Sequence, residues 1–319
     1  MIAHRRIGTT LVVLAVAALA AFGGQATALG RAAALDAQET PLVFRAQTDV
    51  VTVDVSVWQR GRPVRGLSAA DFVVRDAGVP QVLHSASTED VPIDVTLFID
   101  TSSSMADLQA GLERDARTIL GMLRPFDRLR VLTLGYDVHQ WLSWQSPSRT
   151  GAFAMPPIGR VSNVYDALWL AMMRRADAGR RHLVIALTDG DDWSSVMSSA
   201  SLVEAAGRSE SVLHIVRLPS ASGESRRPWQ WSAIRPDMKG QANLQEAAER
   251  SGGRVHEALA AGRQVVNAFE RAFDDFRQGY VLSYAYQGPR VDGWHDIDVS
   301  VSRPDSVAVR ARRGYFARP

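Results

Sequence analysis

Buried strands and amphipathic helices alternate along the middle of this sequence, from residue 92 to residue 277. The apolar runs at 93–99 and 183–187 are typical of strands that are covered on both faces. Helical periodicity follows the first run at 105–123 and returns at 265–276. This order predicts an α/β fold with a Rossmann-like, mostly parallel sheet and helices on both of its faces.

The flanks of this region are β-rich. Alternating apolar residues predict a strand at 51–57, and strand patterns return at 280–284 and 297–301. A small sandwich formed by the two flanks together is a further hypothesis. The predicted parts are a signal peptide at 1–28, a linker at 29–42, a β-rich segment at 43–90, the α/β domain at 91–278 and a second β-rich segment at 279–319.

The N-terminus has the pattern of a secretory signal. Arg5 and Arg6 precede the apolar run from Leu11 to Phe22, and Ala26-Thr27-Ala28 is a small-residue cleavage pattern. The run is short for a bilayer, which needs about 20 apolar residues. We therefore predict an exported protein, periplasmic or extracellular. The alternative is an uncleaved signal that anchors the protein to the inner membrane.

Composition and motifs exclude several classes of function. The net charge is +2, and Arg5 and Arg6 account for it, so nucleic-acid binding is not expected. Cysteine is absent, which excludes disulfides and thiol catalysis. The seven His residues show no spacing of zinc ligands, and neither a phosphate-binding loop nor a Gly-x-Ser-x-Gly elbow occurs. We predict that the protein is not an enzyme and has no catalytic residues.

The most informative segment follows the first buried strand. Asp100 ends this strand, and Ser102 and Ser104 follow it just before a helix. The carboxyl end of a strand is where open α/β sheets bind ligands. One carboxylate and two hydroxyls form an oxygen-only set, which suits a hard cation such as Mg²⁺ or Mn²⁺. The alternative is that these residues only cap the helix.

A second buried strand, at 183–187, also leads to an acid, Asp189, followed by a tight turn at Gly190. If the two strands are neighbours, Asp189 lies near Asp100. Two carboxylates in one cleft repel each other, and a divalent cation relieves that repulsion.

These residues resemble the metal-dependent adhesion site of von Willebrand factor A-type (VWA) domains. Asp100-Thr101-Ser102-Ser103-Ser104 matches the Asp-x-Ser-x-Ser motif of that family, and Leu187-Thr188-Asp189-Gly190 looks like its fourth-strand motif. The resemblance covers residues 92–277 and identifies 91–278 as a VWA domain. It also implies a hydroxyl ligand from a later loop. Relatives have Gly-Gly-Thr there, whereas this sequence has Arg160-Val161-Ser162, so Ser162 is the residue carried over.

The layout is also similar to a bacterial subgroup of exported VWA proteins, through Gly61-Arg62-Pro63-Val64, Asp71-Phe72 and the tail Arg313-Gly314-Tyr315. The resemblance implies a protein-binding module for adhesion or scaffolding, whose partner offers an Asp or Glu carboxylate to the ion.

Two alternatives stay open. One is a structural module for envelope assembly with a non-functional metal site, which the missing glycines before Ser162 favour. The other is a metal-assisted hydrolase with Asp191 or Asp192 as its base. A simpler interpretation of Asp191 and Asp192 is a solvated turn, and Asp166 is expected to cap the helix in which it lies.

Overall fold

The computed structural model describes most of the sequence after residue 49. The predicted signal peptide at 1–28 and the linker at 29–42 lie outside the described residues. The described residues are 50–88, 91–135, 137–150, 156–160, 162–174, 177, 179–219, 239–289, 292–302 and 307–317.

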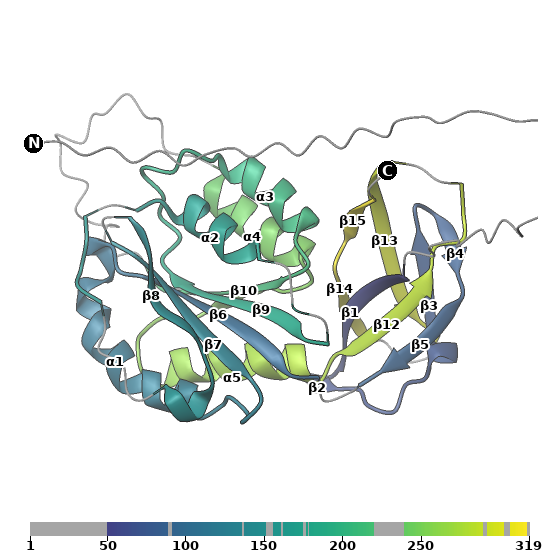
Figure 1. Cartoon of the computed structure of the whole chain (residues 1–319), viewed down its shortest axis with the longest axis horizontal. Coiled ribbons are helices and arrows are strands. Elements are labelled where there is room, and N and C mark those ends of the chain that lie inside the picture. The colour runs from purple at the N-terminus through teal and green to yellow at the C-terminus, as the bar shows by residue number, and fades with distance from the viewer. Residues whose placement is uncertain are drawn as a thin grey trace, which may run out of the picture. The chain divides into compact units, whose positions relative to one another are not determined.

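A six-stranded sheet forms the centre of the α/β part (Figure 1). Its order is β11-β10-β9-β6-β7-β8, and the first five of these strands are parallel, while β8 runs antiparallel to β7. Every residue of β6 is buried, as expected for a strand covered on both faces. The strands are β6 Ile93–Asp100, β7 Arg128–Leu134, β8 Val138–Gln145, β9 Arg181–Thr188, β10 Val212–Arg217 and β11 Val255–Glu257.

Helices cover both faces of this sheet (Figure 1). The side chains of α1 and α5 share one apolar core with β6 and β7, and those of α2, α3 and α4 share another with β9 and β10. The helices are α1 Ala106–Leu120, α2 Val164–Met172, α3 Ser199–Arg208, α4 Gly240–Arg250 and α5 Arg263–Arg277, with 3-10 turns η1 Ala69–Asp71, η2 Ser103–Met105 and η3 Pro147–Arg149.

The β-rich flanks pair with each other in two further sheets, which enclose a third apolar core (Figure 1). In one sheet the order is β14-β1-β12-β5, with β2 beside β1, and in the other it is β15-β13-β3-β4. N-terminal and C-terminal strands are thus neighbours, as the sandwich hypothesis requires. The strands are β1 Val50–Gln59, β2 Arg62–Pro63, β3 Phe72–Asp76, β4 Val79–Gln81, β5 Leu83–Ser87, β12 Tyr280–Ala285, β13 Gly293–Val301, β14 Ala308–Ala311 and β15 Gly314–Ala317.

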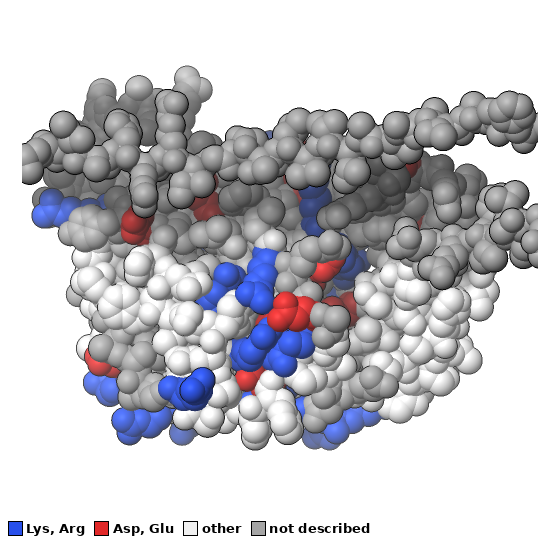
Figure 2. Space-filling view, viewed as in Figure 1, with Lys and Arg blue, Asp and Glu red and all other residues white. Residues whose placement is uncertain are grey.

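Polar contacts join this sandwich to the α/β part. Arg312 donates to the carbonyl oxygens of Gly207 and Ser209, both at 3.1 Å. Arg181 forms an ion pair with Asp54, and Arg313 pairs with Glu246. The space-filling view shows positive and negative side chains next to one another in the middle of the face turned toward the viewer (Figure 2). The junction is therefore held by ion pairs and hydrogen bonds.

The structure adds to the predicted architecture in three places. The described residues form three sheets, one in the α/β part and two in the β-rich flanks. Strands β2, β8, β11 and β15 were not predicted. Asp76 ends β3 and is fully buried, and Tyr284, Tyr315 and His295 bond to its carboxylate at 2.7–2.9 Å. Among the described helices, each is too short or too polar to cross a bilayer.

Candidate metal centre

The ends of β6 and β9 bring two acids to one edge of the sheet. These strands are neighbours, and Ile99 lies opposite Leu187. Asp100 and Asp189 therefore follow at the same edge, and their exposed fractions are only 1% and 3%. The predicted proximity of the two strand ends is found in the structure.

The Asp100 carboxylate is fixed by two hydrogen bonds. The backbone N–H of Ser102 donates to Oδ1 at 2.9 Å, and the Thr188 hydroxyl donates to Oδ2 at 2.7 Å. The hydroxyls of Ser102 and Ser104 lie 3.0 Å apart. Ser102 is the N-cap residue of η2 and Met105 is the N-cap residue of α1, and neither side chain makes a capping hydrogen bond. Helix capping alone therefore does not account for the positions of Asp100, Ser102 and Ser104.

Asp189 is less satisfied than Asp100. Its Oδ1 accepts the N–H of Asp191 at 3.0 Å, whereas its Oδ2 is buried without a hydrogen-bond partner. Burial raises the pKa of Asp100 to about 6, and the negative charge of Asp189 acts in the same direction. Burial also raises the pKa of Asp189, although the Ser104 hydroxyl nearby favours the ionised form. The site thus holds negative charge that lacks compensation.

Ser162 lies against the loop that follows Asp189. Its hydroxyl donates to the carbonyl of Asp191, and its own carbonyl accepts the N–H groups of Trp193, at 2.8 Å, and Ser194, at 3.2 Å. A hydroxyl that donates its proton in this way keeps lone pairs for a cation. The structure thus brings Asp100, Ser102, Ser104 and Asp189 together and ties Ser162 to the neighbouring loop.

A glycine contact sets the path of the Ser162 loop. A Cβ added at Gly159 would lie 1.9 Å from the carbonyl carbon of Gly135, so the two backbones are in direct contact. The N–H of Gly159 also donates to the carbonyl of Thr101 at 2.8 Å. One glycine, three residues before Ser162, therefore places the loop beside the Asp100 segment, and it belongs to none of the predicted motifs.

Asp192 and Asp166 have structural partners that differ from those expected. Asp192 accepts the N–H of Tyr165 at 3.0 Å, so it caps α2 and is not merely part of a solvated turn. Asp166 was expected to cap α2, but its carboxylate instead accepts the N–H groups of Val196 and Met197, both at 2.9 Å. The cap of α2 thus comes from the loop after β9, where the Ser195 hydroxyl donates to the Asp192 carboxylate and holds it in place.

Thr188 is a residue of this centre whose role sequence reasoning missed. It is fully buried, donates to Asp100 and accepts the N–H of Gly190 at 2.9 Å. Its position next to Asp189 was the available signal. It orients one acid and the turn that carries the other.

The donor set fits a hard divalent cation. Carboxylate and hydroxyl oxygens are the ligands that Mg²⁺ and Mn²⁺ prefer. The unpartnered Oδ2 of Asp189 is the kind of buried acceptor that an ion, or a water bound to it, would satisfy.

Comparison with known proteins gives structural neighbours only. No protein-family profile and no curated protein sequence matches this protein. An aerotolerance-related membrane protein from Bacteroides fragilis is 15% identical over 58% of this protein and 99% of its own length, with a TM-score of 0.39. The ArnB paralog VWA2 from Sulfolobus acidocaldarius is 11% identical over 82% of this protein and 76% of its own length, with a TM-score of 0.45.

A von Willebrand factor type A protein from Catenulispora acidiphila is 13% identical over 86% of this protein and 65% of its own length, with a TM-score of 0.43. The protein is thus similar to VWA-type proteins of known structure, the family that its Asp100 and Asp189 motifs resemble.

Proposed function

We propose that this protein is a non-catalytic, VWA-type binding protein that holds Mg²⁺ or Mn²⁺ between the ends of β6 and β9. Ser102, Ser104 and Ser162 coordinate the ion directly, and Asp100 and Asp189 hold waters bound to it. The observation that carries the proposal is the pair of buried acids, one of which has an unpartnered oxygen.

The ligand set determines what kind of partner binds. Because the three direct ligands are neutral hydroxyls, the ion keeps positive charge at the surface of the site. An Asp or Glu carboxylate of a protein partner completes its coordination, as the most favourable anionic oxygen ligand. The proposed role is therefore adhesion or scaffolding between proteins.

The proposed location is outside the cytoplasm. It rests on the pattern of residues 1–28. The protein meets a membrane only if that segment stays uncleaved.

A structural module without a working metal site is the second candidate. Ion pairs join the β-rich flanks to the α/β part, namely Arg313 with Glu246 of α4 and Asp54 with Arg181. These contacts favour a rigid assembly unit. A metal-assisted hydrolase has less support, because Asp192, one of its two candidate bases, is used as the cap of α2.

Calorimetric titration of Mg²⁺ and Mn²⁺ into the purified protein tests the proposal. We expect saturable binding that Asp100→Ala abolishes. The control variant is Asp298→Ala, which removes an exposed acid on β13 of the sandwich and should bind as the unchanged protein does. Absence of binding in the unchanged protein, or equal binding in the Asp100 variant, would favour the structural module.

A further inference from the structure

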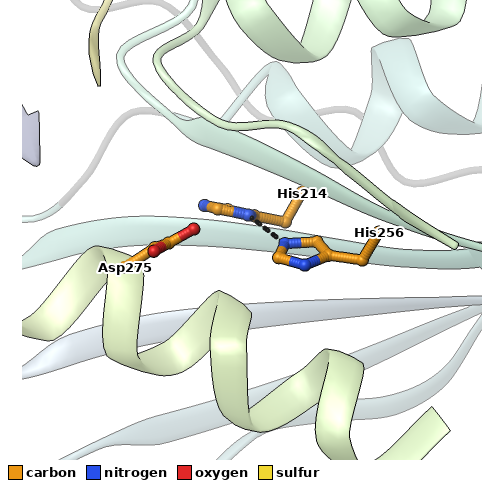
Figure 3. Close-up of side chains that lie close together, drawn as sticks. All are labelled: His214, His256 and Asp275. Atoms are coloured by element: carbon orange, nitrogen blue, oxygen red, sulfur yellow. Dashed lines mark hydrogen bonds between the residues drawn. The ribbon is translucent and has the colours of Figure 1, made fainter. Parts of the chain in front are cut away.

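A second group of metal-type side chains lies inside the α/β part, apart from the first centre. His214 on β10, His256 on β11 and Asp275 on α5 are all buried, and one ligand atom of each lies within 4.8 Å of the others (Figure 3). The three residues are distant in sequence. The fold therefore assembles this group, which is why the His spacing did not predict it.

Strand register brings the two imidazoles together. Val216 of β10 lies opposite His256 of β11, so His214, two residues earlier, shares a face of the sheet with His256. Val216 packs in the same core as α5, so this is the face that α5 covers. The rings are stacked, with centroids 5.2 Å apart, and Nδ1 of His214 lies 2.9 Å from Nε2 of His256.

The Asp275 carboxylate has an oxygen to offer. Its Oδ2 forms an ion pair with Arg254 at 2.6 Å, and Arg310 lies 3.8 Å from the same oxygen. Its Oδ1 is buried and has no hydrogen-bond partner. A buried carboxylate oxygen without a protein partner is rare, and a bound ion or water would satisfy it. Arg254 then acts as an outer partner that orients a ligating carboxylate, whereas the more distant Arg310 mainly adds positive charge.

There is also room beside these groups. His214, Asp275 and Arg310, but not His256, line a small cavity of about 10 Å³ between β1, β10 and α5. That is close to the space that one water-sized particle requires. A small ion fits this volume, whereas an organic ligand does not.

The imidazoles are in the protonation state that a metal requires. Burial lowers the pKa of His256 to about 3 and lowers that of His214 well below its usual value, so both rings are neutral at neutral pH. The hydrogen bond between Nδ1 of His214 and Nε2 of His256 uses one proton. Metal binding at both nitrogens requires that proton to move to the outer nitrogen of its ring, a change of tautomer and not of charge.

We propose that His214, His256 and Asp275 form a binding site for a divalent transition-metal ion of the Zn²⁺ or Co²⁺ class, at the junction of the α/β part and the sandwich. Two imidazole nitrogens and one carboxylate oxygen are typical ligands of such ions, and a water completes a tetrahedron. Ligands about 2.0–2.1 Å from the ion are about 3.3 Å apart, and the ligand atoms of the three residues lie within 4.8 Å of one another, so side-chain rotations that move them by up to about 1.5 Å would bring all three to one ion. This proposal does not depend on the function proposed for the Asp100 centre.

The test uses the Asp100→Ala protein, in which the first centre is disabled, and Co²⁺ as the probe. We expect one equivalent of Co²⁺ to bind with the visible absorption of a tetrahedral complex, and one equivalent of Zn²⁺ to displace it. His256→Gln and Asp275→Asn should each weaken binding by more than about 10-fold. No tetrahedral absorption, or unchanged affinity in both variants, would overturn the proposal.

Arg310→Gln provides an independent test, since a buried ligand substitution can also disturb folding. Arg310 is 39% exposed, and its charge repels a cation at the site. We expect Arg310→Gln to tighten Co²⁺ binding several-fold, while Arg60→Gln, an exposed change in the β1–β2 turn, leaves it unaltered. Weaker or equal binding in Arg310→Gln would contradict a cation site at this position.

Discussion

The Asp100 carboxylate should destabilise the metal-free protein at neutral pH. Its pKa in the folded protein is about 6, against 3.8 for an unperturbed Asp. The folded state therefore binds the proton more tightly than the unfolded state does. It follows that stability rises as the pH falls through 6 toward 4, and that the full penalty of the charge is present above pH 6.

The size of this penalty follows from the shift in pKa. About two pKa units correspond to about 3 kcal/mol, and Asp100 is too deeply buried for solvent to screen much of it. Asp100→Asn removes the charge but keeps only one acceptor for the two donors, Ser102 N–H and Thr188 hydroxyl, at a cost of about 1 kcal/mol. The variant should therefore gain about 2 kcal/mol, or about 4–8 °C in melting temperature.

Thermal unfolding in chelator at pH 7 and pH 5 measures this gain. The unchanged protein should be stabilised at pH 5, and the difference between it and Asp100→Asn should shrink there. This comparison isolates Asp100 from Asp189 and Asp192, whose pKa values are also raised by burial. Mg²⁺ at about 100 times its dissociation constant should then add about 2.7 kcal/mol to the unchanged protein only. A variant that is less stable than the unchanged protein in chelator would refute this reasoning.

Three further substitutions test contacts that hold the sandwich and the loops of the α/β part. Asp76→Ala should destabilise the protein by about 3 kcal/mol or more in urea unfolding, because it leaves the buried donors of Tyr284 and His295 without their acceptor; a loss below about 1 kcal/mol would contradict the network. Gly159→Ala should lower the free energy of unfolding by about 1–3 kcal/mol in the same assay and weaken Mg²⁺ binding, because the added methyl group meets the backbone of Gly135. Unchanged Mg²⁺ affinity would show that this contact does not place the loop that carries Ser162. Asp166→Ala should speed amide exchange at Val196 and Met197 and cost about 1 kcal/mol, as it removes their acceptor; unaltered exchange would rule out this role.

Local sequence patterns predicted the elements that are buried on both faces. The apolar run that became β6 was located almost to the residue, and the run at 183–187 marked the centre of β9, because such strands are continuous in hydropathy. The edge strand β8 was missed, since its burial is mixed and Trp141 on it is 38% exposed. Short edge strands such as β11 and β15 are defined by their partner strands, and a local pattern carries little of that information.

The same distinction applies to the sites. Asp100 and Asp189 were predicted together because each lies at the end of a strand that can be recognised from its own apolar residues. If those two strands are neighbours, the two acids lie close together. Asp76, His214 and His256 gave no such signal, because their partners come from the other end of the sequence or from strands joined by helices. Whether a polar side chain is buried depends on the register of its strand with the neighbouring strands and on the helix or sheet that covers that face. A lone His or Asp in an apolar stretch is therefore best tested by asking which distant strand could lie beside it.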